Sequence, residues 1–470
     1  MLGRSGRAGK CKQKTLAFYR PCLMSTPAEL LHQPAGQLGV FDAIDGLAEI
    51  VRLGKLRLHN ACYQKGAPSC AWDSSEIHLP DPKRTERFRP AVLIDIGGTQ
   101  TKVGYQNDRG EMRCLFDHPN TWFQPSHPGD DSRALEPFLD ALITEIKKNV
   151  PYLAPDCCLG LIWSNQVQCV PIHTPTTRGV SGIVRGSKSG GYRKGEWFLK
   201  GIRDGDDIGA LFLLALSRAG WKPAFFLLGN DTIFTLFATQ RSSAGVVMSS
   251  GGNCTVIGDE GREKGHIINT ELGGNLAIPE NLLSDGDRFC AEMRGVSSLS
   301  LEELCAGLWF PTLVYAHVCA AAELPDGAPL AALRDALVSG EATLNNRMLV
   351  ASLKNPASEL VPQVIRDSGA SFTSLLEALV MRGGALAGAL CYLSVASQLD
   401  IPEGPATVSL DSSMSRHFPG FFASLSKTFK ELCGGRVAEL ILAHPMPVED
   451  GGEISVPMQG IARALNTYET

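Results

Sequence analysis

Apolar runs along this chain alternate with short turn segments, a pattern that predicts strands joined by hairpins. The first set predicts a strand, a glycine turn, a second strand, an NDRG turn and a third strand in AVLIDIGGTQTKVGYQNDRGEMRCLF, residues 91–116. The same order returns in GVVMSSGGNCTVIGDEGREKGHIINTEL, residues 245–272, where Gly251 and Gly252 follow the first strand. Two such units predict a duplicated fold with a cleft between its halves.

Helical spacing of apolar residues fills the gaps between these strands. It is found in two sets of residues: Leu135, Phe138, Leu142 and Ile146, and Phe422, Leu425, Phe429 and Leu432. Asp206 is the predicted cap of a third helix, which runs through IGALFLLALSR and ends near Gly220. Strands that alternate with helices predict an α/β class. The segment 186–196, rich in glycine, serine and basic residues, predicts an exposed loop.

Length and composition narrow the class of protein. A chain of 470 residues exceeds what one core usually serves, so we expect two lobes. Hydrophobic residues at 44% and charged residues at 20% are typical of a globular protein. The net charge of -5 argues against broad binding to nucleic acid. No apolar run approaches the ~20 residues that span a bilayer, so we expect no membrane contact.

The fourteen cysteines contain no CxxC pair and no spacing typical of a zinc site. Because no secretory signal is visible, we expect them to be reduced and mostly buried, and the protein to be cytoplasmic.

The first 28 residues differ in composition from the rest. Their basic residues are Arg4, Arg7, Lys10, Lys12, Lys14 and Arg20, and no acidic residue precedes Glu29. Such a segment is typical of a transit peptide, or of a mispredicted start with Met24 as the true one. The second interpretation is favoured because no long amphipathic pattern accompanies the charges. Either way, residues 1–28 are expected to lie outside the fold.

The first glycine turn is a candidate phosphate site. Glycine lets backbone N–H groups approach a phosphate without a β-carbon clash, and Gly97 and Gly98 directly follow an apolar strand. Asp95 at the end of that strand can hold Mg²⁺ through water, and Thr99 and Lys102 follow the glycines. The alternative is a tight hairpin turn with a capping Asp.

The second glycine turn offers the same backbone geometry with a hydroxyl and an amide added. Its residues are Ser250, Gly251, Gly252 and Asn253. Facing the first turn across a cleft, it would clamp a triphosphate from the opposite side. Taken alone, such a segment is more often a simple loop.

A third candidate follows the strand at 225–229. Strand ends in α/β folds collect ligands, and Asp231 there can accept a proton from a sugar hydroxyl that attacks the γ-phosphate of a nucleotide. The neighbouring amide of Asn230 can bind another hydroxyl. The alternative is a helix cap, because Asn-Asp-Thr is a common capping sequence.

Taken together in order, these segments resemble the hexokinase family. LGNDTIFTLFA resembles its Asn-Asp-Thr motif, IDIGGTQTK its first phosphate motif and VMSSGGN its second. Five further segments resemble family motifs in the same order and align five residues with them: LGLIWSNQ with Ser164, EWFLKGI with Lys200, INTELGG with Glu271, LEELCAGLW with Glu302, and VSLDSSMSRHFPGF with Ser413. The resemblance covers residues 90–465.

The resemblance implies a fold and a division into lobes. The fold would be the two-lobed actin-like (ribonuclease H-like) sugar-kinase fold, with a central cleft. The small lobe would comprise residues 90–226 and 453–470. The large lobe would comprise residues 40–89 and 227–452.

The resemblance also implies an activity, ATP-dependent phosphorylation of a hexose, with glucose expected, at the 6-hydroxyl. Asp231 and Lys200 would be catalytic, with Mg²⁺ bound alongside ATP and water linking it to Asp95. The hexose would be bound by Ser164, Asn230, Asp231, Glu271 and Glu302. ATP would be bound by Asp95, Gly97, Gly98, Thr99, Lys102, Ser250, Gly251, Gly252, Asn253 and Ser413. The ligands would be hexose and MgATP, and the protein a monomer or homodimer.

Several positions depart from the family pattern. Leu199 stands where the family has a phosphate-binding Thr, and Gly252 where Ser or Thr is usual. Further departures are Asn165-Gln166 for Phe-Pro, Leu272 for Trp, Ser412 for Gly and Pro311-Thr312 for Gly-Glu. Two alternatives therefore stay open: a kinase for fructose, mannose or an N-acetylhexosamine, or a sugar sensor with little turnover.

Overall fold

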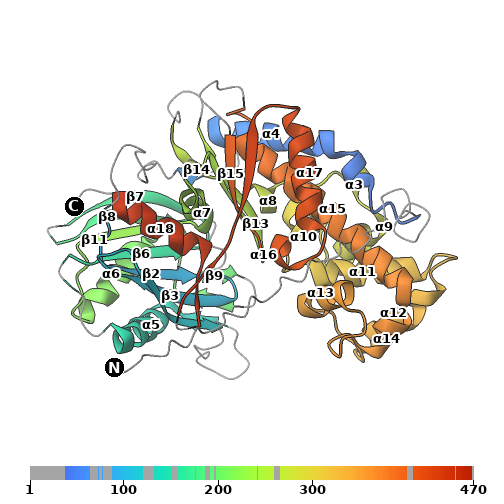
Figure 1. The fold of residues 1–470 in the computed structure, drawn as a ribbon, viewed down its shortest axis with the longest axis horizontal. Helices are drawn as coiled ribbons and strands as arrows, with labels where there is room; N and C mark the ends of the chain where they lie inside the picture. The colour runs from blue at the N-terminus through green and yellow to red at the C-terminus, as the bar shows by residue number, and fades with distance from the viewer. Residues whose placement is uncertain are drawn as a thin grey trace, which may run out of the picture.

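Two large β-sheets, two small ones and a large set of helices make up the described part of the protein (Figure 1). The computed structural model describes residues 37–63, 72–73, 77, 87–119, 132–150, 154, 156–174, 176–185, 191–194, 197–240, 242–258, 265–399, 406–449 and 451–467. The basic leader at 1–28 and most of the predicted loop at 186–196 lie outside these residues.

The two large sheets share the arrangement of five neighbouring strands. The first runs β4-β3-β2-β6-β11-β8-β7 and the second β1-β14-β13-β12-β15-β16. In each, three antiparallel strands are followed by two parallel ones, as β4-β3-β2-β6-β11 and as β14-β13-β12-β15-β16. The predicted duplication is thus confirmed, and so is the α/β class.

The strands of the first sheet are β2 (Ala91–Ile96), β3 (Gln100–Gln106), β4 (Met112–Pro119), β6 (Cys158–Trp163), β7 (Val167–His173), β8 (Arg178–Val184) and β11 (Phe225–Gly229). Those of the second are β1 (Trp72–Asp73), β12 (Ala244–Met248), β13 (Gly252–Ile257), β14 (Ile267–Asn269), β15 (Ala406–Asp411) and β16 (Ala438–Ala443).

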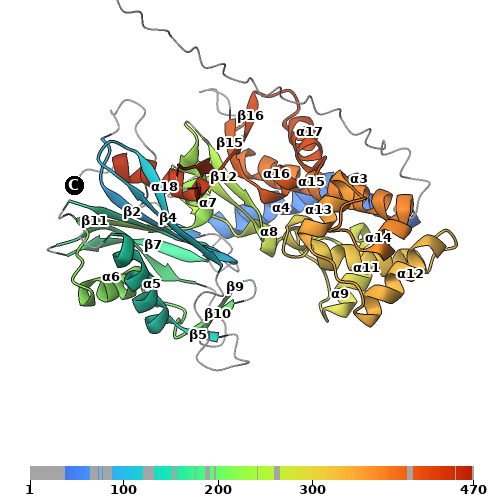
Figure 2. The ribbon, with the colours of Figure 1, turned by 60° about the horizontal axis from the view of Figure 1, so that its bottom comes forward.

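Helices cover both faces of the first sheet. Because side chains alternate along a strand, Val92 and Ile94 of β2 pack with α5 (Leu135–Asn149) and α6 (Ile208–Arg218). Leu93 packs on the opposite face, with α18 (Val456–Thr467). Figure 2 shows α5 and α6 together on one side of this sheet. Strands buried on both faces explain the continuous apolar runs in the sequence.

The N-terminal cap of α6 differs from the predicted one by a single residue. Asp207 is the cap, and its carboxylate accepts the N–H of Ala210 over 2.9 Å. The carboxylate of Asp206 instead accepts the N–H of Arg203 over 2.6 Å. The prediction for Asp206 is therefore wrong, because two adjacent aspartates compete for one cap and only the backbone geometry decides between them.

The helices α7 (Asp231–Ala238) and α18 pack against each other between the two sheets. Their close approach depends on Gly460, where a β-carbon would lie 1.7 Å from the carbonyl oxygen of Phe234. The opposite side of α7 packs on β12, where a β-carbon at Gly245 would lie 2.1 Å from the carbonyl oxygen of Thr232. Both helices begin at the same end of this interface, which brings Asp231 and Ser455 to one cavity.

The large lobe is mostly helical and is organised around the long helix α15 (Gly369–Val395). Its other helices are α3 (Asp42–Asp45), α4 (Leu47–Tyr63), α8 (Leu272–Asn275), η3 (Glu280–Leu282), α9 (Asp285–Met293), α10 (Leu301–Cys305), α11 (Phe310–Ala322), α12 (Ala328–Ser339), α13 (Asn346–Lys354), α14 (Gln363–Asp367), α16 (Ser413–His417) and α17 (Phe421–Cys433).

By length and composition α15 could cross a membrane, which corrects the prediction that no apolar run is long enough. Within the protein, 94% of its most apolar 18-residue segment is buried. The helix packs against α17, α4 and the strands of the second sheet. Its apolar surface is therefore accounted for by the core of the large lobe.

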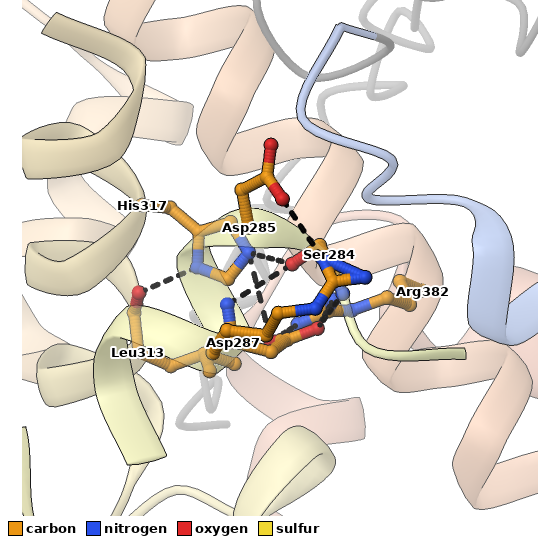
Figure 3. Close-up of polar contacts among 7 residues, drawn as sticks. Ser284, Asp285, Asp287, Leu313, His317 and Arg382 are labelled. Carbon is orange, nitrogen blue, oxygen red and sulfur yellow. Dashed lines mark hydrogen bonds and ion pairs between the residues drawn. The ribbon is translucent and has the colours of Figure 1, made fainter. Parts of the chain in front are cut away.

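A charged cluster is buried in this core (Figure 3). Arg382 of α15 donates two hydrogen bonds to Asp287 of α9, over 2.7 and 2.9 Å. His317 of α11 contacts the hydroxyl of Ser284 over 2.8 Å. Burial alone would raise the pKa of Asp287, but Arg382 and His317 lower it overall. The cluster ties three helices together, because removing either charge would leave the other buried without its partner.

The cysteines follow the prediction over the part of the chain that the structure describes. Eleven are free there, and nine of those are buried.

Candidate active site

A cavity of about 160 Å³ lies between the two lobes and takes residues from both sheets. Three carboxylates line it: Asp95 from β2, Asp231 at the start of α7 and Asp411 at the end of β15. Lys102 of β3 and Arg416 of α16 are the cations that line it in the described part of the chain. A polar cavity of mixed charge at strand ends and helix starts is typical of a site for anionic ligands.

The first glycine turn lies where the sequence predicted it. The predicted nucleotide-binding residues of this turn all line the cavity: Asp95, Gly97, Gly98, Thr99 and Lys102. The turn is closed by a hydrogen bond of 2.9 Å from the N–H of Gly97 to the carbonyl of Gln100. Lys102 forms an ion pair of 3.3 Å with Asp117 on β4. The structure thus brings this predicted group together.

Asp95 has an unusual environment. The pKa of its carboxyl is raised to about 6, mainly by burial and to a smaller extent by the nearby charge of Asp231. The hydroxyl of Ser455 opposes this shift by donating to Oδ2 of Asp95 over 2.6 Å. A carboxylate poised near neutral pH is common at functional sites. Nothing in the sequence pointed to Ser455, which lies 360 positions away from Asp95.

Asn230 and Asp231 have separate roles. Asn230 is the N-cap of α7, and its side-chain oxygen accepts the N–H of Thr232 over 2.9 Å. Its side-chain nitrogen donates to the carbonyl of Asn165 over 3.2 Å, so this buried amide already has protein partners at both ends. The side chain of Asp231 lines the cavity, and its Oδ1 also accepts the N–H of Thr232 over 2.9 Å. The capping alternative therefore applies to Asn230, and the prediction that Asn230 binds sugar has no support from its contacts.

A polar network extends from α7 to β13 and β14. The hydroxyl of Thr232 lies 3.0 Å from the side-chain oxygen of Asn269, whose amide nitrogen donates to Glu271 over 2.8 Å. Asn253 donates to the same carboxylate oxygen of Glu271 over 2.9 Å. The network links the residue after Asp231 to Glu271. It places Asn253, which was predicted on the ATP side, beside Glu271 on the predicted sugar side.

Glu271 is held in a strained backbone conformation. Its φ is 49°, the left-handed region, and no other non-glycine residue in the described part of the chain has a positive φ. Such strain costs about 1–3 kcal/mol and persists only where surrounding contacts hold it. Here the contacts are the amides of Asn253 and Asn269. Asn269 was not among the predicted site residues, although it lies two residues before Glu271 in the segment INTELGG.

The second glycine turn differs from the prediction. Ser250 lines the cavity, as does Ser249, whereas Gly251, Gly252 and Asn253 are not among the lining residues. The N–H of Gly252 donates to the carboxylate of Glu302 over 3.0 Å. That amide is therefore engaged by α10 and is not directed at a phosphate. Glu302, predicted on the sugar, lies against this turn.

Two solved structures resemble the chain over nearly its whole length. One is the hexokinase of Schistosoma mansoni in complex with glucose, 17% identical, with a TM-score of 0.64 over 94% of this chain and 99% of that one. The chain has the hexokinase fold. A second structure, also described as a hexokinase, is 17% identical with a TM-score of 0.61 and covers 93% of this chain and 97% of that one. No protein-family model and no curated protein matches the sequence.

Within this hexokinase fold, Ser164 at the end of β6 lines the cavity and Lys200 does not. Lys200 is exposed at the end of β10 (Trp197–Lys200), in a small sheet with β5 (Ser132–Ala134) and β9 (Gly191–Lys194). Its neighbour Leu199 is buried in the core of the small lobe. The structure therefore does not bring Lys200 together with Asp231, and its catalytic role stays a prediction.

The segment predicted to lie on the adenosine side contributes other residues to the cavity than the predicted Ser413. Ser413 begins α16 and Ser412 is its cap, with a hydroxyl that accepts the N–H of Ser415 over 2.9 Å. The residues that line the cavity are Asp411 and Arg416 on either side. Asp411 could have been predicted to line the cavity, because it lies at the end of an apolar strand, as Asp95 does.

The carboxylates fit a magnesium ion that is held mainly by water and phosphate. No group of three potential ligands is close enough to hold a metal by itself in the described residues. Mg²⁺ usually takes one or two carboxylates and keeps several waters and phosphate oxygens. Asp95, buried in a cavity that also contains Asp231 and Asp411, suits that coordination.

Proposed function

We propose that the protein is an ATP-dependent hexose kinase that transfers the γ-phosphoryl group to the 6-hydroxyl, with glucose as the expected hexose. One observation carries the proposal. Asp231 lies in a cavity that contains the first glycine turn and is joined through Thr232 and Asn269 to Glu271. This arrangement supports a role for Asp231 as a base between a candidate phosphate site and a candidate sugar site.

Asp231 would act as the general base. Its carboxylate takes the proton of the 6-hydroxyl as that oxygen attacks the γ-phosphorus, and the bond to the β-phosphate oxygen breaks to release ADP. Asn230 caps α7, and the carboxylate of Asp231, whose Oδ1 accepts the N–H of Thr232 over 2.9 Å, lines the cavity where the substrate would lie.

The phosphate groups would lie against Gly97, Gly98 and Thr99, with Ser250 on the facing turn. Lys102 would pair with a phosphate oxygen. Asp95, through water, would hold Mg²⁺, which supplies positive charge to the phosphates when bound. Ser455 keeps the carboxylate of Asp95 oriented for that role over 2.6 Å.

The hexose would be bound by Glu271, Asn253 and Ser164. A carboxylate and an amide held together by Asn269 present a fixed set of donors and acceptors to sugar hydroxyls. A wrong sugar would leave these groups unpaired, which is how polar sites discriminate. Fructose, mannose and N-acetylhexosamine are the other candidate substrates for the same machinery.

A second candidate function is a sugar-binding sensor with little turnover. Two observations favour it: Leu199 replaces a phosphate-binding Thr with a buried apolar side chain, and the N–H of Gly252 is engaged by Glu302. Both reduce the number of donors for the transferred phosphoryl group.

Coupled ADP release, measured across a panel of hexoses and without sugar, tests the proposal. A hexose kinase gives ADP in a one-to-one ratio with sugar 6-phosphate. A sensor binds hexose in calorimetry but releases ADP no faster with sugar than without it. If no hexose binds and none stimulates ADP release, both functions are contradicted.

A further inference from the structure

We infer that Arg416 is a phosphate-binding residue of this site, positioned by Asp411 and supplied from the large lobe opposite Lys102. The inference rests on the proposed function, because it concerns the triphosphate of the nucleotide. Arg416 lies in the segment VSLDSSMSRHFPGF, of which the sequence comparison assigned only Ser413 a role. It lines the cavity from the short helix α16, which directly follows the strand β15.

The contacts of Arg416 fix the guanidinium by one of its nitrogens. Nη1 donates to Oδ1 of Asp411 over 2.7 Å and to the carbonyl of Ala443 over 3.1 Å. These contacts come from the ends of β15 and β16, which are neighbouring strands of the second sheet. Arginine carries five N–H donors in a rigid fork, so the edge formed by Nη2 and Nε can serve a second acceptor.

The charges of the cavity explain why a second cation is needed. Asp95, Asp231 and Asp411 line the same space, and a triphosphate adds about four negative charges to it, part of which Mg²⁺ offsets. Lys102 is already paired with Asp117 over 3.3 Å. A guanidinium binds phosphate oxygens in pairs and cannot lose its proton, so Arg416 is suited to be the second cation that binds the phosphates.

The engaged second turn strengthens this assignment. Gly252 directs its N–H to Glu302, so one expected donor on the large-lobe side of the phosphates is missing. Arg416 provides charged donors from the same lobe as that turn. It would therefore take over contacts that the turn does not make.

Calorimetry with a ligand series tests the inference. Adenosine, ADP and ATP, the latter two with Mg²⁺, are titrated into the full-length protein and into the variant Arg416→Met. Loss of a charge-assisted contact should weaken ATP and ADP binding roughly ten- to hundredfold and leave adenosine binding within about twofold. Arg436→Met, an exposed change in the same lobe, is the matched control and should bind all three as the wild type does.

A double variant separates phosphate binding from neutralisation of Asp411. Removing Arg416 leaves the charge of Asp411 unpaired, which by itself would repel a phosphate. Asp411→Asn together with Arg416→Met removes that charge as well. The inference expects ATP binding to stay weak in the double variant, and recovery to within about twofold of the wild type would overturn it.

The remaining outcomes are also distinguishable. If the wild type binds neither ATP nor ADP, the proposed kinase function fails together with the inference. If the wild type binds ATP and Arg416→Met binds it equally well, only the inference fails. Should Arg416→Met not fold by its melting temperature, Arg416→Lys replaces it. Lysine cannot span Asp411 and a phosphate at once, so ATP binding weakened at least threefold supports the inference and unchanged binding overturns it.

Discussion

The hydroxyl of Ser455 donates to Oδ2 of Asp95 over 2.6 Å, joining the residue that precedes α18 to the end of the strand β2. The bond stabilises the charged form of a buried carboxyl whose pKa lies at about 6. Charge at the candidate phosphate site therefore depends on a segment from the other end of the chain.

The variant Ser455→Ala should shift the pH profile of kcat/KM. Without the hydroxyl, burial raises the pKa of Asp95 above about 6, so the acidic limb of the profile moves to higher pH. Ser455→Thr retains the hydroxyl and should restore the wild-type limb. A limb that stays in place in Ser455→Ala, with activity intact at every pH, would show that the ionisation of Asp95 does not limit the reaction.

The variant Asp231→Asn should lower kcat by ~10²–10⁴-fold, because an amide cannot take the hydroxyl proton. Hexose affinity should change much less, since the amide oxygen still accepts a hydrogen bond. Steady-state kinetics and hexose titration measure both effects. Retention of more than about a tenth of kcat would exclude Asp231 as the base.

The companion variants Asp231→Ala and Asn230→Ala separate catalysis from capping. Because Asn230 is the cap of α7, Asn230→Ala should lower the free energy of unfolding by about 1 kcal/mol or more, whereas Asp231→Ala should change it little. Urea unfolding of both proteins checks this. The opposite order of stabilities would assign the cap to Asp231.

The variant Glu271→Gln should raise the KM for hexose about tenfold or more at an unchanged melting temperature. A carboxylate that accepts sugar hydroxyls forms charge-assisted hydrogen bonds, and losing one costs about 1.5–3 kcal/mol. The amides of Asn253 and Asn269 can still bond the remaining oxygen, so the backbone strain stays supported. Glu341→Gln, an exposed change elsewhere in the large lobe, is the control. Equal KM values for the two variants would place Glu271 outside the sugar site.

Stability should fall as pH falls from about 6.5 to about 4 because of His317. Burial lowers the pKa of this histidine to about 4, against the opposing effect of Asp287, so the folded protein keeps it neutral while the unfolded chain takes up a proton near pH 6.5. The unfolded state therefore binds more protons in this window, and each pH unit costs up to about 1.4 kcal/mol. The variant His317→Gln has no ionisable group at this position, so its stability lacks this dependence on pH. Urea unfolding should show its stability approaching that of the wild type as the pH is lowered, and a constant difference would contradict the assignment.

Local sequence patterns determined the elements of this fold. Alternating and continuous apolar runs predicted β2 and β12 with their hairpins, and both form as expected. The candidate residues that follow strands were found for the same reason: Asp95 and Asp231 lie where a short apolar run ends, and both line the cavity. These signals are local because strand burial repeats every two residues and a strand end is marked by the residue that follows it.

Only the tertiary structure decided which residues at these strand ends contact one another. The bonds of Ser455 to Asp95 and of Glu302 to Gly252 join positions that lie 360 and 50 residues apart. Arg416 acquires its place only when β15 and β16 lie side by side and present Asp411 and Ala443 to it. Such contacts cannot be predicted from the periodicity of apolar residues. They depend on the packing of α7 against α18, which decides which strand ends meet at one cavity. Hydrogen-bond partners in a buried site follow from that geometry, and the same residue types in the same order could have formed other pairs.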